Sequence, residues 1–180
     1  MNDDLHIGDV GIAIIAFFEA SVNYKGMMPE GLERIPSKYL TAYLDTLATK
    51  HIWTIGFGNT PHDYPWIKEG ARITEEQAYD MLRASLAGYE NQVKAAVKVP
   101  LTQNQFDALV SWTYNLGSGN LRRSTMLKRI NEGRWDDAYK EMRKWNRAGG
   151  KVRNGLVKRR MYESNVFRYN FLTDDSLLPK

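Results

Sequence analysis

Two helix-start signals and one short stretch of strand-like alternation constrain the fold of this chain most strongly. T-E-E-Q at Thr74–Gln77 and T-Q-N-Q at Thr102–Gln105 both match the capping box, in which Thr and Gln side chains satisfy the first backbone N–H groups of a helix. Alternation with a period of two residues is found over 41–47 and again over 52–57. We therefore predict an α+β fold: a small lobe with one hairpin and a larger helical lobe.

The 180 residues, of which 43% are hydrophobic, predict a single domain over 1–180. Helical spacing of apolar residues, together with the caps, predicts most of the chain to be helical. Breaker residues mark a loop or irregular insert at 20–38 and a tail at 171–180 that should fray. We expect helices over 7–19, 74–97, from Thr102 past Trp112, over Thr125–Asn131, along Trp135, Ala138, Met142 and Trp145, and over 154–168, with glycine turns at 115–120 and 148–150.

The expected hairpin would bring two polar side chains together. Segments 41–47 and 52–57 read as strands joined by a short turn at 48–51. Side chains two residues apart along a strand share a face, and paired strands present their faces to the same space. Asp45 and Thr54 are therefore expected to lie on neighbouring strands and to face the same space.

Glu19 ends the apolar run G-I-A-I-I-A-F-F-E, and it shares one helical stripe with Ile12 and Ile15. An acid with apolar neighbours suits a proton donor, which must hold its proton until the reaction needs it. With Asp45 and Thr54 opposite, the three side chains match what hydrolysis of a glycosidic bond requires. The structural alternatives are a surface charge for Glu19, a solvated carboxylate for Asp45 and an ordinary β-branched strand residue for Thr54.

Composition excludes several classes of protein. The chain has no cysteine, so it has neither disulfides nor thiolate metal sites, and its three histidines lack ligand spacing. The apolar run 10–18 is too short to span a bilayer and follows acidic rather than basic residues, so we expect neither stable membrane insertion nor a signal peptide. We expect no metal and no organic cofactor.

Charge is spread unevenly along the chain. The net charge is +4, but residues 121–160 hold fourteen Lys and Arg against four acids, a balance of +10. Such a surface attracts an anionic polymer, either a nucleic acid or a bacterial wall with free peptide carboxylates. A solvated helical surface would carry the same pattern.

These motifs resemble the phage-type lysozymes of glycoside hydrolase family 24. The resemblance covers about residues 7–168, in ordered blocks that chance does not readily produce. The blocks are F-F-E at 17–19, A-Y-L-D at 42–45, T-I-G-F-G-N-T at 54–60, I-T-E-E-Q-A at 73–78, P-L-T-Q-N-Q-F-D-A-L-V at 100–110, Y-N-L-G-S-G at 114–119, S-T-M-L-K at 124–128, W-N-R-A-G-G-K at 145–151 and G-L-V-K-R-R at 155–160.

The resemblance implies a lysozyme-like fold with Glu19 as proton donor and Asp45 and Thr54 as the water-holding pair. It also implies that Tyr114, and with weaker support Asn146, bind substrate; the alternative for Tyr114 is an ordinary core side chain. Two features depart from the family. Between Glu19 and Asp45 lie 25 residues, more than usual, which the insert at 20–38 would explain, and Asn59 stands where the family commonly has His. Glu30 and Glu33 in the insert are the rival acids; we prefer Glu19 because it alone ends an apolar helix.

The implied activity is hydrolysis of the β-1,4 bond between N-acetylmuramic acid and N-acetylglucosamine in peptidoglycan, with inversion, during phage lysis or wall digestion by a virion. The expected partners are peptidoglycan strands and a holin for export from the host cytoplasm to the wall; we expect a monomer and no nucleic acid partner. The rival hypotheses are a lytic transglycosylase on the same bond and a non-catalytic module that binds wall or nucleic acid.

Overall fold

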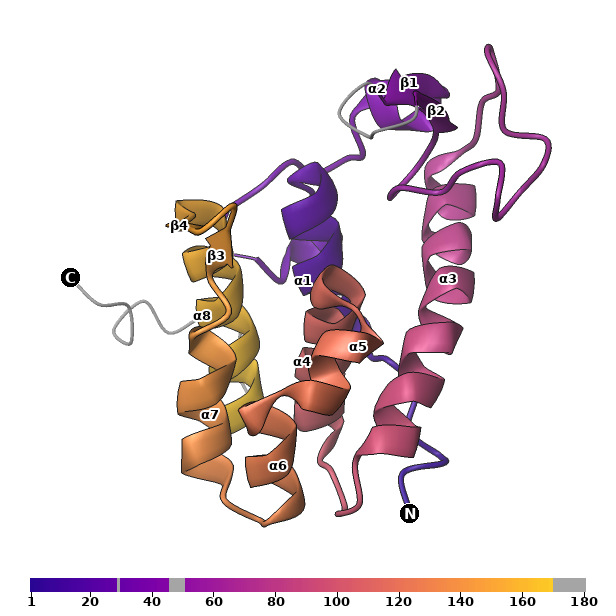
Figure 1. The fold of residues 1–180 in the computed structure, drawn as a ribbon. Helices are drawn as coiled ribbons and strands as arrows, with labels where there is room; N and C mark the ends of the chain where they lie inside the picture. Colours follow the sequence, from indigo (N-terminus) through magenta and orange to yellow (C-terminus); the bar gives the residue numbers. More distant parts are fainter. Residues whose placement is uncertain (29, 46–50, 170–180) are drawn as a thin grey trace.

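The computed structural model describes residues 1–28, 30–45 and 51–169, which form two lobes of unequal size (Figure 1). A small lobe at the top of the figure contains the paired strands, and a larger lobe below contains most of the helices. The long helix α3, Glu75–Ala96, runs from the small lobe to the far end of the helical lobe. The predicted α+β architecture is confirmed.

The helical lobe is built around α4, which packs against α1, α3 and α8. Its core consists of fully buried apolar side chains, among them Ile14, Ile15, Phe106, Leu109 and Trp112. Removing such side chains from water is the main favourable term in folding. The helices of this lobe are α1 Asp9–Ala20, α4 Gln103–Leu116, α5 Ser118–Arg123, α6 Thr125–Asn131, α7 Trp135–Arg143 and α8 Asn154–Tyr169.

The helix starts that the caps predicted are confirmed. Thr74 accepts a hydrogen bond from the backbone of Gln77, and Thr102 accepts one from Gln105, with the reciprocal Gln contacts completing both capping boxes. Ser124 caps α6 through the backbone N–H of Leu127. Caps were predictable because they join residues only three positions apart.

The small lobe has a two-stranded antiparallel sheet. β1, Tyr43–Asp45, pairs with β2, Ile52–Thr54, in a register that sets Tyr43 opposite Thr54 and Asp45 opposite Ile52. Within the described residues both strands are shorter than predicted, and residues 46–50, which hold most of the expected turn at 48–51, lie outside them. The short helix α2, Ser37–Leu40, leads into β1.

Two glycine turns differ from the prediction. The turn expected at 115–120 is reduced to Gly117, at φ +85°, and α5 begins at the next residue. The A-G-G segment does not simply end a helix: β3, Arg147–Ala148, and β4, Lys151–Val152, form a second hairpin whose turn residues Gly149 and Gly150 both have positive φ. Two consecutive residues at positive φ are the signature of a tight hairpin turn, which explains the difference.

The described part of the segment 20–38 is mostly irregular, as predicted, with a 3-10 turn η1 at Tyr24–Gly26 and the start of α2 at Ser37. Its side chains tie it to other elements: Lys25 Nζ lies 2.6 Å from Asp9 Oδ2 in α1, and Arg34 Nε lies 2.7 Å from Glu75 Oε1 in α3. Ion pairs therefore hold this segment against both α1 and the first turn of α3. The expected tail at 171–180 lies outside the described residues.

Candidate active site

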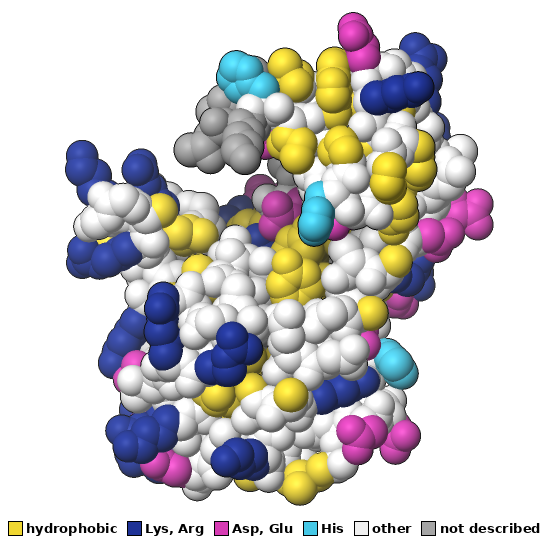
Figure 2. Space-filling view, turned by 45° about the vertical axis from the view of Figure 1, so that its right-hand side comes forward, with side chains coloured by type: hydrophobic (Ala, Val, Ile, Leu, Met, Phe, Trp, Pro, Cys, Tyr) yellow, Lys and Arg dark blue, Asp and Glu magenta, His cyan; other side chains and the backbone are white. Residues whose placement is uncertain are grey.

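Glu19, Asp45 and Thr54 line one cavity of about 380 Å³ between the end of α1 and the β1–β2 hairpin. In the space-filling view a hollow separates the two lobes, and acidic side-chain atoms lie at its floor (Figure 2). The three side chains that the sequence singled out are thus brought to a common space, although they come from a helix and two strands.

Glu19 lies in the last turn of α1, where the helix ends at Ser21 in the left-handed conformation. The other end of α1 is anchored by Asp107, whose carboxylate accepts hydrogen bonds from the backbone N–H groups of Gly8 and Gly11. Burial raises the pKa of Asp107, while these hydrogen bonds partly oppose the rise. With α1 held in this way, the Glu19 side chain reaches the cavity at 31% exposure.

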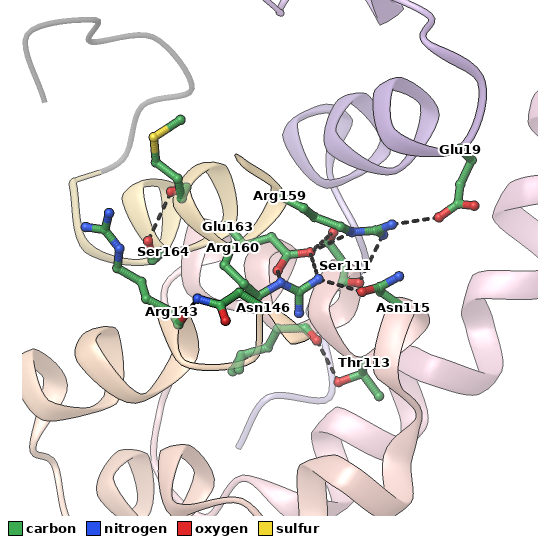
Figure 3. Close-up of polar contacts among 12 residues, drawn as sticks. Glu19, Ser111, Thr113, Asn115, Arg143, Asn146, Arg159, Arg160, Glu163 and Ser164 are labelled. Carbon is green, nitrogen blue, oxygen red and sulfur yellow. Dashed lines mark hydrogen bonds and ion pairs between the residues drawn. The ribbon is translucent and has the colours of Figure 1, made fainter. Parts of the chain in front are cut away.

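The sequence did not predict the partner of Glu19. Arg159 Nη1, on α8, donates a hydrogen bond of 2.7 Å to Glu19 Oε1 (Figure 3). Burial by itself lowers the pKa of Arg159, but the charges and hydrogen bonds of Glu163 and Glu19 outweigh burial and raise it. The acid therefore faces a cation as well as its apolar neighbours, and the expectation of an apolar surrounding alone was incomplete.

Arg159 belongs to the block G-L-V-K-R-R at 155–160, which the sequence shows clearly. Its charge is one of the fourteen that predict a basic surface over residues 121–160. Arg159 and Arg160 are in fact buried, at 3% and 0% exposure. Sequence alone gives little reason to bury two adjacent arginines, because Arg is seldom fully buried unless it is paired. Their partner, Glu163, lies on the same helix.

On the opposite side, Asp45 and Thr54 project from the paired strands. Thr54 is only 4% exposed, and its Oγ1 donates a hydrogen bond of 3.3 Å to the carbonyl of Ile52. Tyr43, directly across from Thr54, also lines the cavity, and burial raises its pKa. This side of the cavity therefore presents a carboxylate, a hydroxyl and a neutral phenol.

The cavity continues in both directions. An adjoining cavity of about 410 Å³ shares Tyr39, Tyr43 and Asp45 and adds Lys38. On the other side, a cavity of about 250 Å³ shares Phe57 and Gly58 and is closed by other aromatic and polar side chains. Because neighbouring cavities share lining residues, the three adjoin one another, and we call them together the groove.

Tyr114 lines the third cavity, and its hydroxyl donates a hydrogen bond of 2.9 Å to the carbonyl of Phe57. Burial, followed by the nearby charge of Glu19, raises the pKa of Tyr114 well above its usual range. Asn146 lies apart from these cavities, and its Nδ2 donates a hydrogen bond of 3.2 Å to the carbonyl of Arg143. The structure thus brings Tyr114, but not Asn146, to the groove.

The rival acids occupy other positions. Glu30 is exposed and forms an ion pair with Lys158. Glu33 is also exposed, and neither residue is among those that line the three cavities. Within the described ranges, no group of three or more His, Asp or Glu side chains is arranged to hold a metal ion, and no helix is long and apolar enough to cross a membrane.

Comparison with known proteins identifies the family of this chain. A family model described as phage lysozyme matches residues 33–163, a span that contains Asp45 and Thr54 but begins after Glu19. The endolysin of Bacillus phage PZA is 40% identical over 163 residues, 91% of this chain and 55% of that protein. The SAR-endolysin of Enterobacteria phage P21 is 34% identical over 160 residues, 89% of each chain.

Among solved structures, an endolysin from Escherichia coli O157:H7 phage FAHEc1 has 35% identity and a TM-score of 0.70, with 98% of each chain covered. The chain spans about half the length of the two endolysins of Bacillus phages that it matches, 55% and 54%. The family match covers most of the chain, and the strand-borne Asp and Thr lie within it. The chain therefore belongs to the phage lysozyme family.

Proposed function

We propose that this protein is a lysozyme that hydrolyses the β-1,4 bond between N-acetylmuramic acid and N-acetylglucosamine in peptidoglycan. One observation carries the proposal: a carboxyl group at a helix end faces a carboxylate and a hydroxyl across one open cavity. Glycosidases use two carboxyl groups on opposite sides of the scissile bond. Membership of the phage lysozyme family supports the choice of substrate.

In the proposed mechanism, Glu19 gives its proton to the glycosidic oxygen as the bond from that oxygen to the anomeric carbon breaks. Asp45 stabilises the positive charge that develops on the sugar, and it takes a proton from the attacking water. Thr54 holds that water through its hydroxyl. The water oxygen forms the new bond from the opposite face, so the products are two chains, with inversion at the new reducing end.

The groove supports a polymeric substrate. Its cavities extend past Asp45 toward Lys38 and past Phe57 toward Tyr114, so sugars on both sides of the broken bond would contact the protein. We propose that the Tyr114 ring is part of this wall. Asn146 stays a weaker prediction, because its amide nitrogen is engaged with Arg143. Tyr114→Ala should raise KM for wall fragments, and Asn146→Ala should change it less.

The decisive experiment follows digestion of purified peptidoglycan and identifies the new chain ends. Hydrolysis gives reducing ends, whereas a lytic transglycosylase gives an anhydro sugar because no water enters the bond. We expect reducing ends and inverted anomeric configuration when the products are trapped early. Anhydro products would favour the transglycosylase, and binding without cleavage would favour a non-catalytic wall-binding module.

We further propose that the protein acts as a monomer in phage lysis and reaches the wall from the host cytoplasm through a membrane lesion made by a holin. Relatives named endolysins support the setting. Host cells that express the protein should lyse only after the membrane is permeabilised, and light scattering should give the mass of one chain. Lysis without permeabilisation would contradict the holin route, and a doubled mass would contradict the monomer.

A further inference from the structure

A cluster of charged side chains lies buried beneath the end of α1 (Figure 3). It consists of Arg159, Arg160 and Glu163 on α8, with Ser111 and Asn115 contributed by α4. The carboxylate of Glu163 and the guanidinium of Arg160 are at 0% and 1% exposure. Burying charges is costly, so a fully buried carboxylate with two arginines calls for an explanation.

The hydrogen bonds that the Glu163 carboxylate accepts all go to Oε1, and Oε2 has an ion-pair contact only. Its Oε1 accepts hydrogen bonds from Ser111 Oγ at 2.7 Å, from Arg159 Nε at 3.1 Å and from Arg160 Nη2 at 3.4 Å. Its Oε2 lies 3.1 Å from Arg160 Nε. Glu163 therefore contacts both arginines at once.

These contacts fix the orientation of the Arg159 guanidinium. Its Nε is held by Glu163 and its Nη2 by the carbonyl of Ser111 at 3.5 Å, while its guanidinium carbon lies 5.5 Å from the centre of the Phe18 ring. A guanidinium is planar, with its donors in fixed directions. Once Nε and Nη2 are held, Nη1 has one direction left, and in that direction it meets Glu19 Oε1 at 2.7 Å.

We propose that Glu163 is a positioning residue for the reaction: it holds the Arg159 guanidinium between two carboxylates, so that Arg159 orients Glu19 toward the groove. The inference rests on the proposed function, since it concerns the acid of that reaction. It gives the buried Glu163 a role beyond balancing two buried cations.

The charges explain why a second carboxylate is needed. Arg159 alone would favour the ionised form of Glu19, which is the form that has no proton to donate. Glu163 shares the same guanidinium and so offsets part of the positive charge that Glu19 meets. Arg160 also pairs with Glu163, so it weakens the influence of the Glu163 charge on Arg159.

The described groups that act on Glu163 and Glu19 come from α8, α4 and β1. Around Glu163, the charged groups are Arg159 and Arg160 from α8, and α4 contributes the neutral Ser111 and Asn115. Around Glu19 are Arg159, the phenols of Tyr43 and Tyr114, and Asp45 across the cavity. Removing the charge of Glu163 should therefore act on Glu19 through Arg159.

The test compares Glu163→Gln with the wild type on purified peptidoglycan at a series of pH values. Gln keeps the size and an oxygen for Ser111 and Arg159, but it loses the charge. The ratio of variant to wild-type activity cancels the titration of the substrate itself. We expect this ratio to fall as pH rises, because the alkaline limit of activity moves lower by about one pH unit, at the low end of what a neighbouring charge does.

Arg160→Gln is the matched control. Arg160 is equally buried and also contacts Glu163, and burial lowers its pKa to about 10. Replacing Arg160 disturbs the same cluster but keeps the ion pair between Glu163 and Arg159. The alkaline limit of activity should therefore stay in place or move to higher pH. A purely structural role for Glu163 predicts instead that both variants lose activity by the same factor at every pH, and that result would overturn the proposal.

If Glu163→Gln alone does not fold, the double variant Glu163→Gln, Arg160→Gln removes one buried charge of each sign and should fold. Its alkaline limit of activity should be lowered in the same way. A second readout needs no substrate: carbon-13 NMR of the Glu19 carboxyl, assigned by its absence in Glu19→Gln, should titrate about one pH unit lower in the variant. An unchanged midpoint overturns the role of Glu163. A wild type that does not cleave peptidoglycan overturns the proposed function instead, and the NMR titration still decides on Glu163.

Discussion

The two sides of the groove hold their polar side chains by different means. Glu19 is held by a hydrogen bond from Arg159, 140 positions away in the sequence, and through it by a buried cluster between α4 and α8. Asp45 and Thr54 are held by three-residue strands paired through a short ladder. The comparison teaches that stability and catalysis should be coupled on the acid side and largely separate on the hairpin side.

Replacing the acid should have the largest effect. Glu19→Gln removes the proton but keeps the shape, so wall cleavage should fall by about 10²–10⁴-fold, while the protein should still fold. Glu30→Gln is the matched control, because Glu30 is an exposed acid paired with Lys158. Initial rates of peptidoglycan clearing measure both. Loss of activity in the Glu30 variant alone would show that our choice of acid is wrong.

On the hairpin side, Asp45→Asn should lower activity by about 10²–10³-fold, the range for removing one electrostatic contact to a transition state. Its free energy of unfolding should change by less than about 0.5 kcal/mol, as for most partly exposed sites. Leu44→Gln is the control, since Leu44 is 42% exposed and its neighbours on the strand face the other way. Urea unfolding together with rate assays makes the comparison. If Asp45→Asn lowers the free energy of unfolding as much as Arg159→Met does, the proposed difference between the two sides of the groove is wrong.

Arg159→Met tests the coupling on the acid side. It leaves Glu163 with Arg160 alone, so the free energy of unfolding should fall by about 3 kcal/mol, the low end for breaking a buried ion pair. Activity per folded molecule should fall as well, by about tenfold if one hydrogen bond to Glu19 is lost. Thermal unfolding and rates normalised to the folded fraction measure the two effects. Full activity per folded molecule would show that Arg159 serves stability alone.

Thr54→Val distinguishes a catalytic hydroxyl from an ordinary strand residue. Val is β-branched like Thr and suits a strand equally well, so the hairpin should form. Activity should fall by about tenfold, the equivalent of one hydrogen bond to water, and Thr54→Ser should restore part of it. Unchanged activity in the Val variant would mean that Thr54 has only a structural role.

The smallest effect is expected from the basic surface of the helical lobe. Arg122, Arg123 and Lys128 are exposed and line one cavity of about 370 Å³, far in sequence from the hairpin. Reversing the charges of Arg122 and Lys128 should slow digestion of intact walls by a few-fold, and short soluble fragments should be less affected, because attraction to a polyanion depends on the summed field.

Salt provides the control for this last prediction. The defect on intact walls should shrink as ionic strength rises, because screening then weakens the same attraction in the wild type. Lys68→Glu, on the small lobe, should have little effect. Equal losses on both substrates, or no dependence on salt, would make this surface a solvated helical face.

Local signals in the sequence account for much of the fold. Capping boxes at Thr74 and Thr102 predicted two helix starts because a cap joins residues three positions apart. Strand alternation predicted that Asp45 and Thr54 share a face, since successive side chains alternate. The second hairpin at 147–152 was missed, because so short a ladder leaves almost no alternation to detect.

The sequence by itself determined which residue types are available for the chemistry and which short-range elements present them: an acid at the end of an apolar helix, and a carboxylate and hydroxyl on a hairpin. Only the tertiary structure decided that Glu19 meets Arg159, that Glu163 holds Arg159, and that Glu30 lies elsewhere. The physical reason is that a buried charge is tolerated only beside its partner. That partner is chosen by the packing of α8 against α4 and α1, which local patterns do not record.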